Sequence, residues 1–271
     1  MVTVQLAFLS GKYHATPWDR HVNEGALEWP PSPWRLLRAF AAVGFRKLGW
    51  NSEKPPQEAV HLLECLASEL PGYWIPPASM GHSRHYMPKY RSVLDGKTDK
   101  VIDAFVAVKT DTPVIIHWPN ITLKTASQEL LQQIISALSF LGRAESWVEG
   151  TLIDGPDRDL NVLPANETKK EGKSGMVIIL APTTPEEYSI WRRQQVDSES
   201  APSKRLPDDL FGALLVDTRL LRSEGWNRPP GSFWADYLRP HDAFRIIPAS
   251  GKRSPSPPKT IAKFALVAES K

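Results

Sequence analysis

The sequence lacks the residues and motifs on which many enzyme classes depend. Cys65 is the only cysteine among 271 residues, which excludes a disulfide framework and a zinc site built from cysteines. No apolar run approaches the roughly 18 residues that indicate a membrane-spanning helix. The signatures GxGxxG, GxxxxGK[ST], HExxH and GxSxG are all missing. The sequence therefore gives no support to dinucleotide-binding, phosphate-loop, metalloprotease or serine-hydrolase chemistry.

An excess of one charge is also missing. The 33 Lys and Arg residues against 30 Asp and Glu residues leave a formal charge of +3, which does not by itself indicate a nucleic-acid partner. Two segments, residues 80–100 and 239–271, are more basic than the rest. Such segments are typical of phosphate contacts and also of solvated loops. Residues 1–10 lack the basic start and cleavage site of a signal peptide, so we expect a cytoplasmic protein.

Hydrophobic periodicity predicts strands and helices in alternation over the first half of the chain. Apolar residues alternate with small or polar ones over residues 2–10, which is typical of a strand. Ser32 as an N-cap and Pro33 at the first helical position predict a helix over 33–48. The other predicted elements are helices over 57–70 and 125–141, strands over 103–109 and 114–118 that form a hairpin, and a strand over 145–153.

These elements follow the order β, α, β, β, α, β, which is that of the ferredoxin-like fold and of the RNA-recognition motif (RRM). We therefore expect an α+β protein with a ferredoxin-like (RRM-like) core over residues 1–155. An insertion at about 75–102 is expected between the first helix and the second strand of that core. Long loops in compact domains are usually functional or disordered. Residues 156–271 are predicted to form an irregular C-terminal extension that packs on the core. Its expected elements are strands over 176–180 and 261–267, helices over 185–195 and 207–222, and a loop rich in Pro and Gly over 223–258.

Two clusters of polar residues lie near the N-terminus. In the loop over residues 12–25, His14 or His21 is a candidate acid–base group, because an unperturbed imidazole titrates near neutrality. The same side chains are suited to bonding the backbone of the loop. Arg35 and Arg38 lie one turn apart at the start of the predicted helix, where they would meet a phosphate or form a solvated face.

The segment over residues 81–89 combines cations, an aromatic ring and two imidazoles. Tyr86 is suited to stacking on a base while Arg84 and Lys89 bind phosphates, as in proteins that bind single strands. RNA cleavage needs a base for the 2′-OH and an acid for the leaving oxygen, which His85 with Tyr86 or Lys89 would supply. A polar surface loop is the alternative interpretation.

Other candidate features favour structural roles. His82 and His85 are spaced as a ligand pair, but no cysteine or acidic residue follows at metal spacing, so we expect no metal and no cofactor. The tryptophans, Trp226 and Trp234 among them, are mostly flanked by proline or apolar residues. This favours anchors in the core or in loops over platforms for bases.

Several phrases together resemble the CRISPR-associated Cas-five/Cas-six fusion family of type I-G (formerly I-U) systems. The resemblance extends from the N-terminus to about residue 240. The phrases that carry it are residues 21–25 (HVNEG), 28–39 (EWPPSPWRLLRA), 81–88 (GHSRHYMP), 141–148 (LGRAESWV) and 229–232 (PPGS).

The resemblance implies an RNA-binding subunit of a Cascade-type surveillance complex. The Cas-five part of that family has a ferredoxin-like core and a thumb-like β insertion, caps the 5′ handle of the guide RNA and touches the adjacent backbone subunit. The Cas-six part is a C-terminal ribonuclease. This sequence stops where that second part would begin, so no catalytic residue is assigned from the resemblance.

The resemblance thus implies a protein of antiviral defence that holds the 5′ handle of a CRISPR RNA. Its expected partners are that RNA, the backbone and large subunits of the complex and, indirectly, target DNA, with no membrane partner. Two alternatives stay open: a metal-independent endoribonuclease acting through His85 or His21, and an interaction module without RNA contact. The residues expected to contact RNA are His21, Arg35, Arg38, Arg84, His85, Tyr86 and Lys89.

Overall fold

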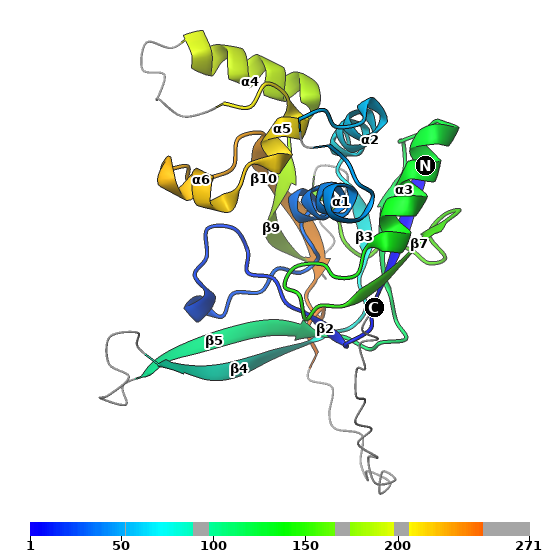
Figure 1. The fold of residues 1–271 in the computed structure, drawn as a ribbon. Helices are drawn as coiled ribbons and strands as arrows, with labels where there is room; N and C mark the ends of the chain where they lie inside the picture. Colours follow the sequence, from blue (N-terminus) through cyan, green and yellow to red (C-terminus); the bar gives the residue numbers. More distant parts are fainter. Residues whose placement is uncertain (52, 89–97, 166–173, 198–205, 246–271) are drawn as a thin grey trace, which may run out of the picture.

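The computed structural model describes residues 1–51, 53–88, 98–165, 174–197 and 206–245 (Figure 1). They form an α+β structure whose sheets are antiparallel. The strands are β1 Val2–Phe8, β2 Lys12–Tyr13, β3 Gly72–Trp74, β4 Ser79–Pro88, β5 Thr98–Ala107, β6 Val114–Trp118, β7 Val148–Ile153, β8 Leu163–Pro164, β9 Ser174–Pro182 and β10 Ser232–Pro240. The helices are α1 Pro33–Lys47, α2 Gln57–Ala67, α3 Thr125–Ala137, α4 Pro185–Asp197, α5 Leu210–Leu215 and α6 Thr218–Ser223, with a 3-10 turn η1 at Val22–Glu24.

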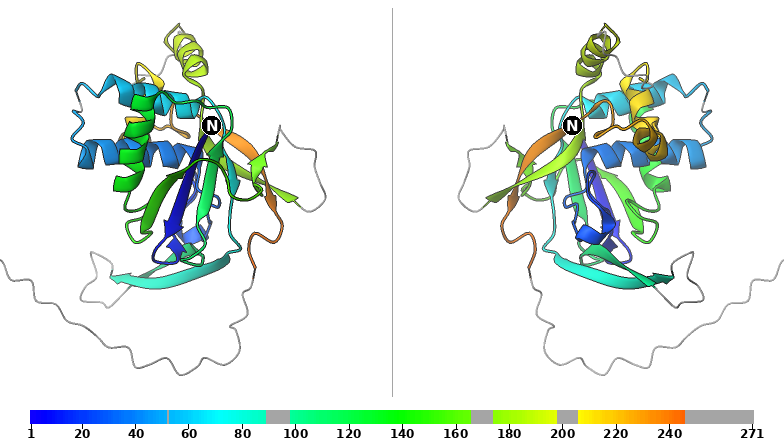
Figure 2. Two further views of the ribbon diagram at one scale, coloured as in Figure 1. Left: turned by 90° about the vertical axis from the view of Figure 1, so that its right-hand side faces the viewer. Right: turned by 90° about the vertical axis from the view of Figure 1, so that its left-hand side faces the viewer.

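The largest sheet has the strand order β3-β6-β1-β7, and all neighbouring strands are antiparallel. Helices α1, α2 and α3 pack together against one face of it (Figure 2). The predicted first strand is confirmed: Val4 and Leu6 are fully buried, whereas Gln5 and Ala7 between them are half-buried. Alternate residues of a strand point to opposite faces, so this pattern fixes which face of β1 meets the helices.

Helix α1 begins as its sequence predicts. The Ser32 side chain accepts a hydrogen bond from the backbone N–H of Arg35, and Pro33 occupies the first turn. Proline costs nothing there because its missing N–H would have no partner within the helix. Leu36 and Phe40, four residues apart on one face, are fully buried. The helix is therefore anchored in the core from its first turn.

The predicted hairpin between residues 103–109 and 114–118 is wrong. Strand β5 pairs with β4 and β2, whereas β6 lies between β1 and β3 in the main sheet. Both edges of β6 are occupied, so β5 has no edge there to pair with. The second strand of the main sheet is instead β3, and its three residues are too few to show a period in the sequence.

The insertion predicted at about 75–102 therefore has a different place in the topology. It follows β3 rather than preceding the second strand of the sheet. Its described part is a long hairpin of β4 and β5, ten residues each, rather than an irregular loop. The hairpin projects from the body of the protein (Figure 1).

Helix α3 ends at Ala137, four residues before the predicted end at 141. The chain then turns so that the backbone N–H of Arg143 donates to the His14 carbonyl at 2.9 Å. Gly142, expected to stop the helix, has a φ of 88°, and a Cβ there would lie 2.5 Å from the His14 oxygen. Because it has no Cβ, Gly142 allows this segment to pack closely against the loop after β2.

The C-terminal part forms a second sheet with the order β8-β10-β9. It adjoins the main sheet at β3, where the Tyr73 and Tyr237 rings meet edge to face at 5.8 Å. The predicted loop over 223–258 is wrong where β10 lies, because that strand pairs with β9 along its whole length. The predicted helix over 207–222 is two short helices, and Asp217 caps the second. The strand predicted over 261–267 lies outside the described residues. Among the described residues, every helix is too short or too polar to cross a lipid bilayer.

Candidate nucleic-acid interface

One face of the β4–β5 hairpin carries cationic and aromatic side chains. The register pairs Arg84 with Ile102 and Tyr86 with Lys100, and directly paired residues of antiparallel strands lie on the same face. His82, two residues before Arg84, shares this face. All four polar side chains are exposed, and Tyr86 is 63% exposed. The two acidic residues of β5 are Asp99 and Asp103. Each is an odd number of positions away from Lys100, so both lie on the opposite face.

That opposite face holds His85 against Asp103. The imidazole Nε2 atom lies 3.1 Å from a carboxylate oxygen of Asp103 and 3.1 Å from the Ser83 hydroxyl. Arg143, from the loop after α3, lies 3.1 Å from the other carboxylate oxygen. Asp103 is 14% exposed, whereas His85 is half-exposed. His85 and Tyr86 therefore point to opposite faces of the hairpin.

A second histidine supports the base of the hairpin. His14 follows β2 and is buried, and its Nδ1 atom lies 2.5 Å from a carboxylate oxygen of Glu145. Its Nε2 atom lies 3.9 Å from Asp103. The Ser146 hydroxyl accepts the His14 backbone N–H at 2.8 Å. Burial acts to raise the pKa of Glu145, but hydrogen bonds from its own backbone and from His14 hold that pKa below 4.5.

The loop that contains His21 lies along the outer edge of β5. The side-chain oxygen of Asn23 accepts the Ile102 backbone N–H at 3.1 Å, which occupies part of that strand edge. His21 is exposed, and its backbone N–H donates to Glu24 at 3.0 Å. Arg20 forms an ion pair with the same carboxylate at 3.2 Å. The structure thus places His21 beside the hairpin with its ring at the surface.

Arg35 belongs to a buried network inside the protein. Its guanidinium donates to both carboxylate oxygens of Glu28, at 2.7 and 3.0 Å, and to the Thr16 carbonyl at 2.9 Å. The Tyr13 hydroxyl donates to Glu28 at 2.6 Å, and so does the Ser32 backbone N–H at 3.0 Å. Burial acts to raise the pKa of Glu28, but the Arg35 charge and these donors hold that pKa below its ordinary 4.5. Burial and Glu28 raise the pKa of Tyr13 well above its ordinary value.

Arg38 is also engaged with the protein. Its guanidinium donates to the carbonyls of Leu214 and Val216, at 2.6 and 2.8 Å, where α5 ends. Burial and the neighbouring Arg35 charge lower its pKa below the ordinary value. Both arginines line a cavity of about 220 Å³. Their donors are largely used in holding the fold, which sets them apart from the side chains of the hairpin.

The structure therefore brings only some of the predicted RNA-contact residues together. Arg84 and Tyr86 share one exposed face, His85 lies on the other, and His21 lies on the adjoining loop. Arg35 and Arg38 are separate from them, and Lys89 lies outside the described residues. Sequence reasoning assigned no role to three further residues at this interface, namely Asp103, Arg143 and Glu145. They come from a strand and a loop distant in sequence from residues 81–89, and only the pairing of β4 with β5 would have indicated the first.

No group of three or more His, Cys, Asp or Glu residues in the described ranges is arranged to hold a metal ion. The chain matches no protein-family model and no curated protein.

Proposed function

We propose that this chain is an RNA-binding subunit of a type I CRISPR surveillance complex, acting in the cytoplasm and holding the 5′ handle of the guide RNA. The observation that carries the proposal is the separation of charge on the β4–β5 hairpin. Its exposed Arg84, Tyr86 and Lys100 share one face, and both acidic residues of β5 lie on the other. A cationic groove or face combined with a stacking ring is the usual means of binding single-stranded RNA.

The architecture of the body supports the same proposal. The strand order β3-β6-β1-β7 with antiparallel neighbours, and with helices on one face, is compatible with a ferredoxin-like core. Proteins of many functions have such a core, so RNA binding is inferred from the hairpin and not from the core. The backbone and large subunits, and target DNA through them, are the partners that the sequence resemblance adds to this proposal.

The test is an anisotropy titration of the full chain with labelled repeat RNA across a range of salt concentrations. Replacing Arg84 and Lys100 together by alanine should flatten the slope of log K against log salt by about 1.4 to 1.8, since each phosphate contact contributes about 0.7 to 0.9. Tyr86→Ala should weaken binding by about 1–3 kcal/mol with little change of that slope. The matched control is Arg46→Ala with Lys124→Ala, which removes two exposed cations from α1 and from the start of α3. RNA affinity that is absent, or equal in the hairpin and control variants, contradicts the proposal and favours an interaction module.

A second candidate function is metal-independent cleavage of repeat RNA. The contact between His85 and Asp103 favours it, because a neighbouring carboxylate orients an imidazole for proton transfer. In such a step the imidazole takes the proton of a 2′-OH. The 2′-oxygen then attacks phosphorus, the bond to the 5′-oxygen breaks, and an acid protonates that oxygen. Tyr86 lies on the other face of the hairpin and is not placed to be that acid.

The cleavage hypothesis is tested by incubating the chain with end-labelled repeat RNA in EDTA. Cleavage at one position that leaves a 2′,3′-cyclic phosphate, and that is lost in His85→Ala but kept in His82→Ala, would establish it. If the wild-type chain leaves the RNA intact, as His85→Ala does, RNA binding without cleavage remains the proposed function.

A further inference from the structure

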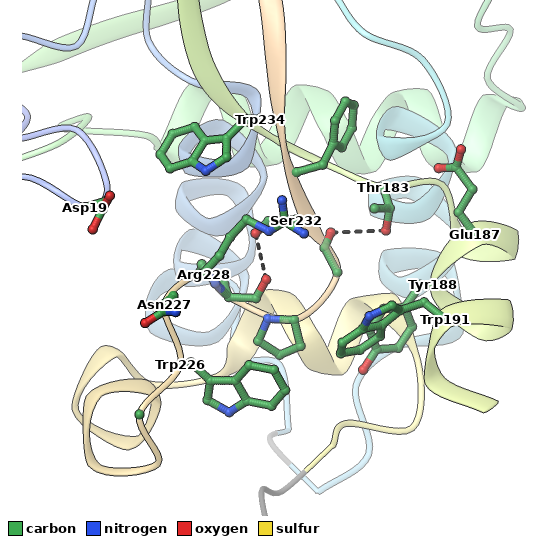
Figure 3. A pocket seen from close by; sticks show the side chains of 15 residues that line it. Asp19, Thr183, Glu187, Tyr188, Trp191, Trp226, Asn227, Arg228, Ser232 and Trp234 are labelled. Atoms are coloured by element: carbon green, nitrogen blue, oxygen red, sulfur yellow. Dashed lines mark hydrogen bonds between the residues drawn. The ribbon is translucent and has the colours of Figure 1, made fainter. Parts of the chain in front are cut away.

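An aromatic pocket lies far along the sequence from the hairpin, between α4 and the segment that leads into β10. Its volume is about 580 Å³, which is within the range of small-molecule sites. Tyr188 and Trp191 of α4 line it, together with Trp226 of the segment that leads into β10 and Trp234 of β10 itself (Figure 3). The tryptophans at 226 and 234, expected as anchors in the core or in loops, both line this pocket.

Three of the rings in this pocket pack against one another. The Trp191 ring lies between two others, with centroids 5.6 Å from Tyr188 and 6.2 Å from Trp226. The Trp234 ring, on the paired strand β10, is 38% exposed. An exposed indole in a concave site presents its face to a planar ligand, and stacking of that kind is what holds bases on proteins.

Arg228 supplies a positive charge to the same pocket. It is exposed, and within the described residues its guanidinium has no hydrogen-bond or carboxylate partner. Figure 3 shows it between Trp234 and Trp226 in that view. A guanidinium beside aromatic rings disfavours a cationic ligand and favours an anionic one, and its planar fork suits phosphate oxygens. Two carboxylates, Asp19 and Glu187, also line the pocket, and they are acceptors for the N–H groups of a base.

The wall that carries Arg228 is held in place before any ligand binds. Gly231 has a φ of 73°, and a Cβ at this position would lie 2.9 Å from Leu210 and 3.0 Å from Tyr188. Its carbonyl accepts the Thr183 backbone N–H at 2.9 Å, and the Ser232 hydroxyl donates to the Pro229 carbonyl at 2.7 Å. A preformed site loses less conformational entropy on binding than a site that must be assembled.

The N-terminal loop connects this pocket to the hairpin. Asp19 lines the pocket, and Asn23, four residues later, bonds the backbone of β5. Four residues span at most about 14 Å. Trp18 ties the other side of the loop to the pocket segment, because its indole N–H donates to the Asn227 carbonyl at 3.0 Å.

We propose that this pocket, lined by Trp191, Trp226, Trp234 and Arg228, binds one nucleotide of the RNA held by the hairpin. The base stacks on the exposed Trp234 indole at the aromatic wall of the pocket, and the Arg228 guanidinium binds a phosphate of the same strand. This inference rests on the proposed RNA-binding function and assigns it a second contact site, in the C-terminal half of the chain.

The experiment is ¹⁹F NMR of the full chain labelled with 5-fluorotryptophan, with signals assigned from single Trp→Phe variants. Titration with AMP, GMP, CMP or UMP should shift the signals of Trp191, Trp226 and Trp234. The signal of Trp147, which is 61% exposed elsewhere on the surface, should stay unchanged. Ribose 5-phosphate, which has no base, should produce no shift. Arg228→Ala should weaken the nucleotide affinity about tenfold, as is typical for one charged hydrogen bond. The control Arg222→Ala, an exposed arginine on α6, should not.

Repeat RNA then distinguishes this inference from the proposed function. It should shift the same three signals, and Trp234→Ala should weaken RNA binding about tenfold while Trp147→Ala leaves it unchanged. Arg84→Ala should weaken RNA binding without changing the affinity of the pocket for a mononucleotide. If hairpin variants weaken RNA binding but neither mononucleotides nor RNA shift the pocket signals, the pocket inference alone is overturned. Shifts with mononucleotides and none with RNA also overturn it, because the pocket would then serve a free nucleotide.

Discussion

The Nε2 atom of His85 lies 3.1 Å from a carboxylate oxygen of Asp103, its diagonal neighbour across the β4–β5 hairpin. This contact, with Arg143 on the other carboxylate oxygen, ties the hairpin to the loop after α3. Two segments that resemble the same family, residues 81–88 and 141–148, therefore meet in space at a residue that belongs to neither. Asp103 thus joins the hairpin to the body of the protein.

Replacing Asp103 by asparagine should loosen the hairpin without unfolding the protein. An amide keeps the shape but loses the charge that faces His85 and Arg143. We expect a loss of about 1 kcal/mol in the free energy of unfolding, a modest value because both partners are partly exposed and screened by solvent. Hydrogen–deuterium exchange should accelerate over 79–88 and 98–107. The control is Asp111→Asn on the exposed turn after β5, and equal exchange in the two variants would contradict the role given to Asp103.

Much of the body was predictable because its signals are local. The alternation in β1 and the cap of α1 at Ser32 depend on neighbouring residues, and both appear as expected. The pairing of strands is not local. Residues 103–109 have the composition of a strand, but nothing in them indicates that they pair with residues 79–83 rather than with 114–118. Strand β3 was missed because three residues show no period.

The candidate site was harder to predict for the same reason. A polar cluster in the sequence does not say which side chains share a face until the register is known. Arg35 shows this clearly: one turn into a helix it is placed to meet a phosphate, yet the structure turns it onto Glu28, seven residues earlier in a loop. The register of β4 against β5 likewise separates His85 from Tyr86 and brings Lys100 beside Tyr86.

Glu28→Gln should destabilise the protein strongly. The substitution leaves Arg35 buried without its carboxylate, and removing one partner of a buried ion pair typically costs about 3–5 kcal/mol. Chemical denaturation at pH 7 measures this loss. Glu53→Gln, on an exposed loop, is the control and should change the stability by less than about 0.5 kcal/mol.

The pH dependence of stability should differ between the wild type and Glu28→Gln. The pKa of Glu28 in the folded state is depressed below 4.5, so its stabilisation is fully present above 4.5 and is lost as the pH falls through the folded-state pKa. The wild type should therefore lose stability more steeply than the variant below pH 4.5, and the two curves should converge in acid. Parallel curves from pH 7 to pH 2 would show that Glu28 is not the linked group.

Arg38→Ala should affect stability rather than RNA affinity. It removes the donors to two carbonyls at the end of α5, and leaving buried acceptors without partners costs about 1–3 kcal/mol. Exchange over α5 and α6 should accelerate. Binding of repeat RNA, measured where the variant is fully folded, should change less than twofold. A tenfold loss of RNA affinity in the folded variant would instead place Arg38 at the RNA.

Gly142→Ala should destabilise the protein more than Gly49→Ala, although both glycines have positive φ angles, 88° and 72°. At Gly49 a Cβ would meet nothing within 4 Å, so the cost is that of the backbone conformation alone, about 1 kcal/mol. At Gly142 the Cβ would lie 2.5 Å from the His14 carbonyl oxygen, which must then move away from Arg143. Adding a clash of this kind brings the expected loss to about 2–4 kcal/mol in chemical denaturation. Because His14 and Arg143 support the base of the hairpin, the folded fraction of Gly142→Ala should also bind repeat RNA more weakly. Equal losses of stability at the two positions would show that the loop after α3 does not hold His14 in place.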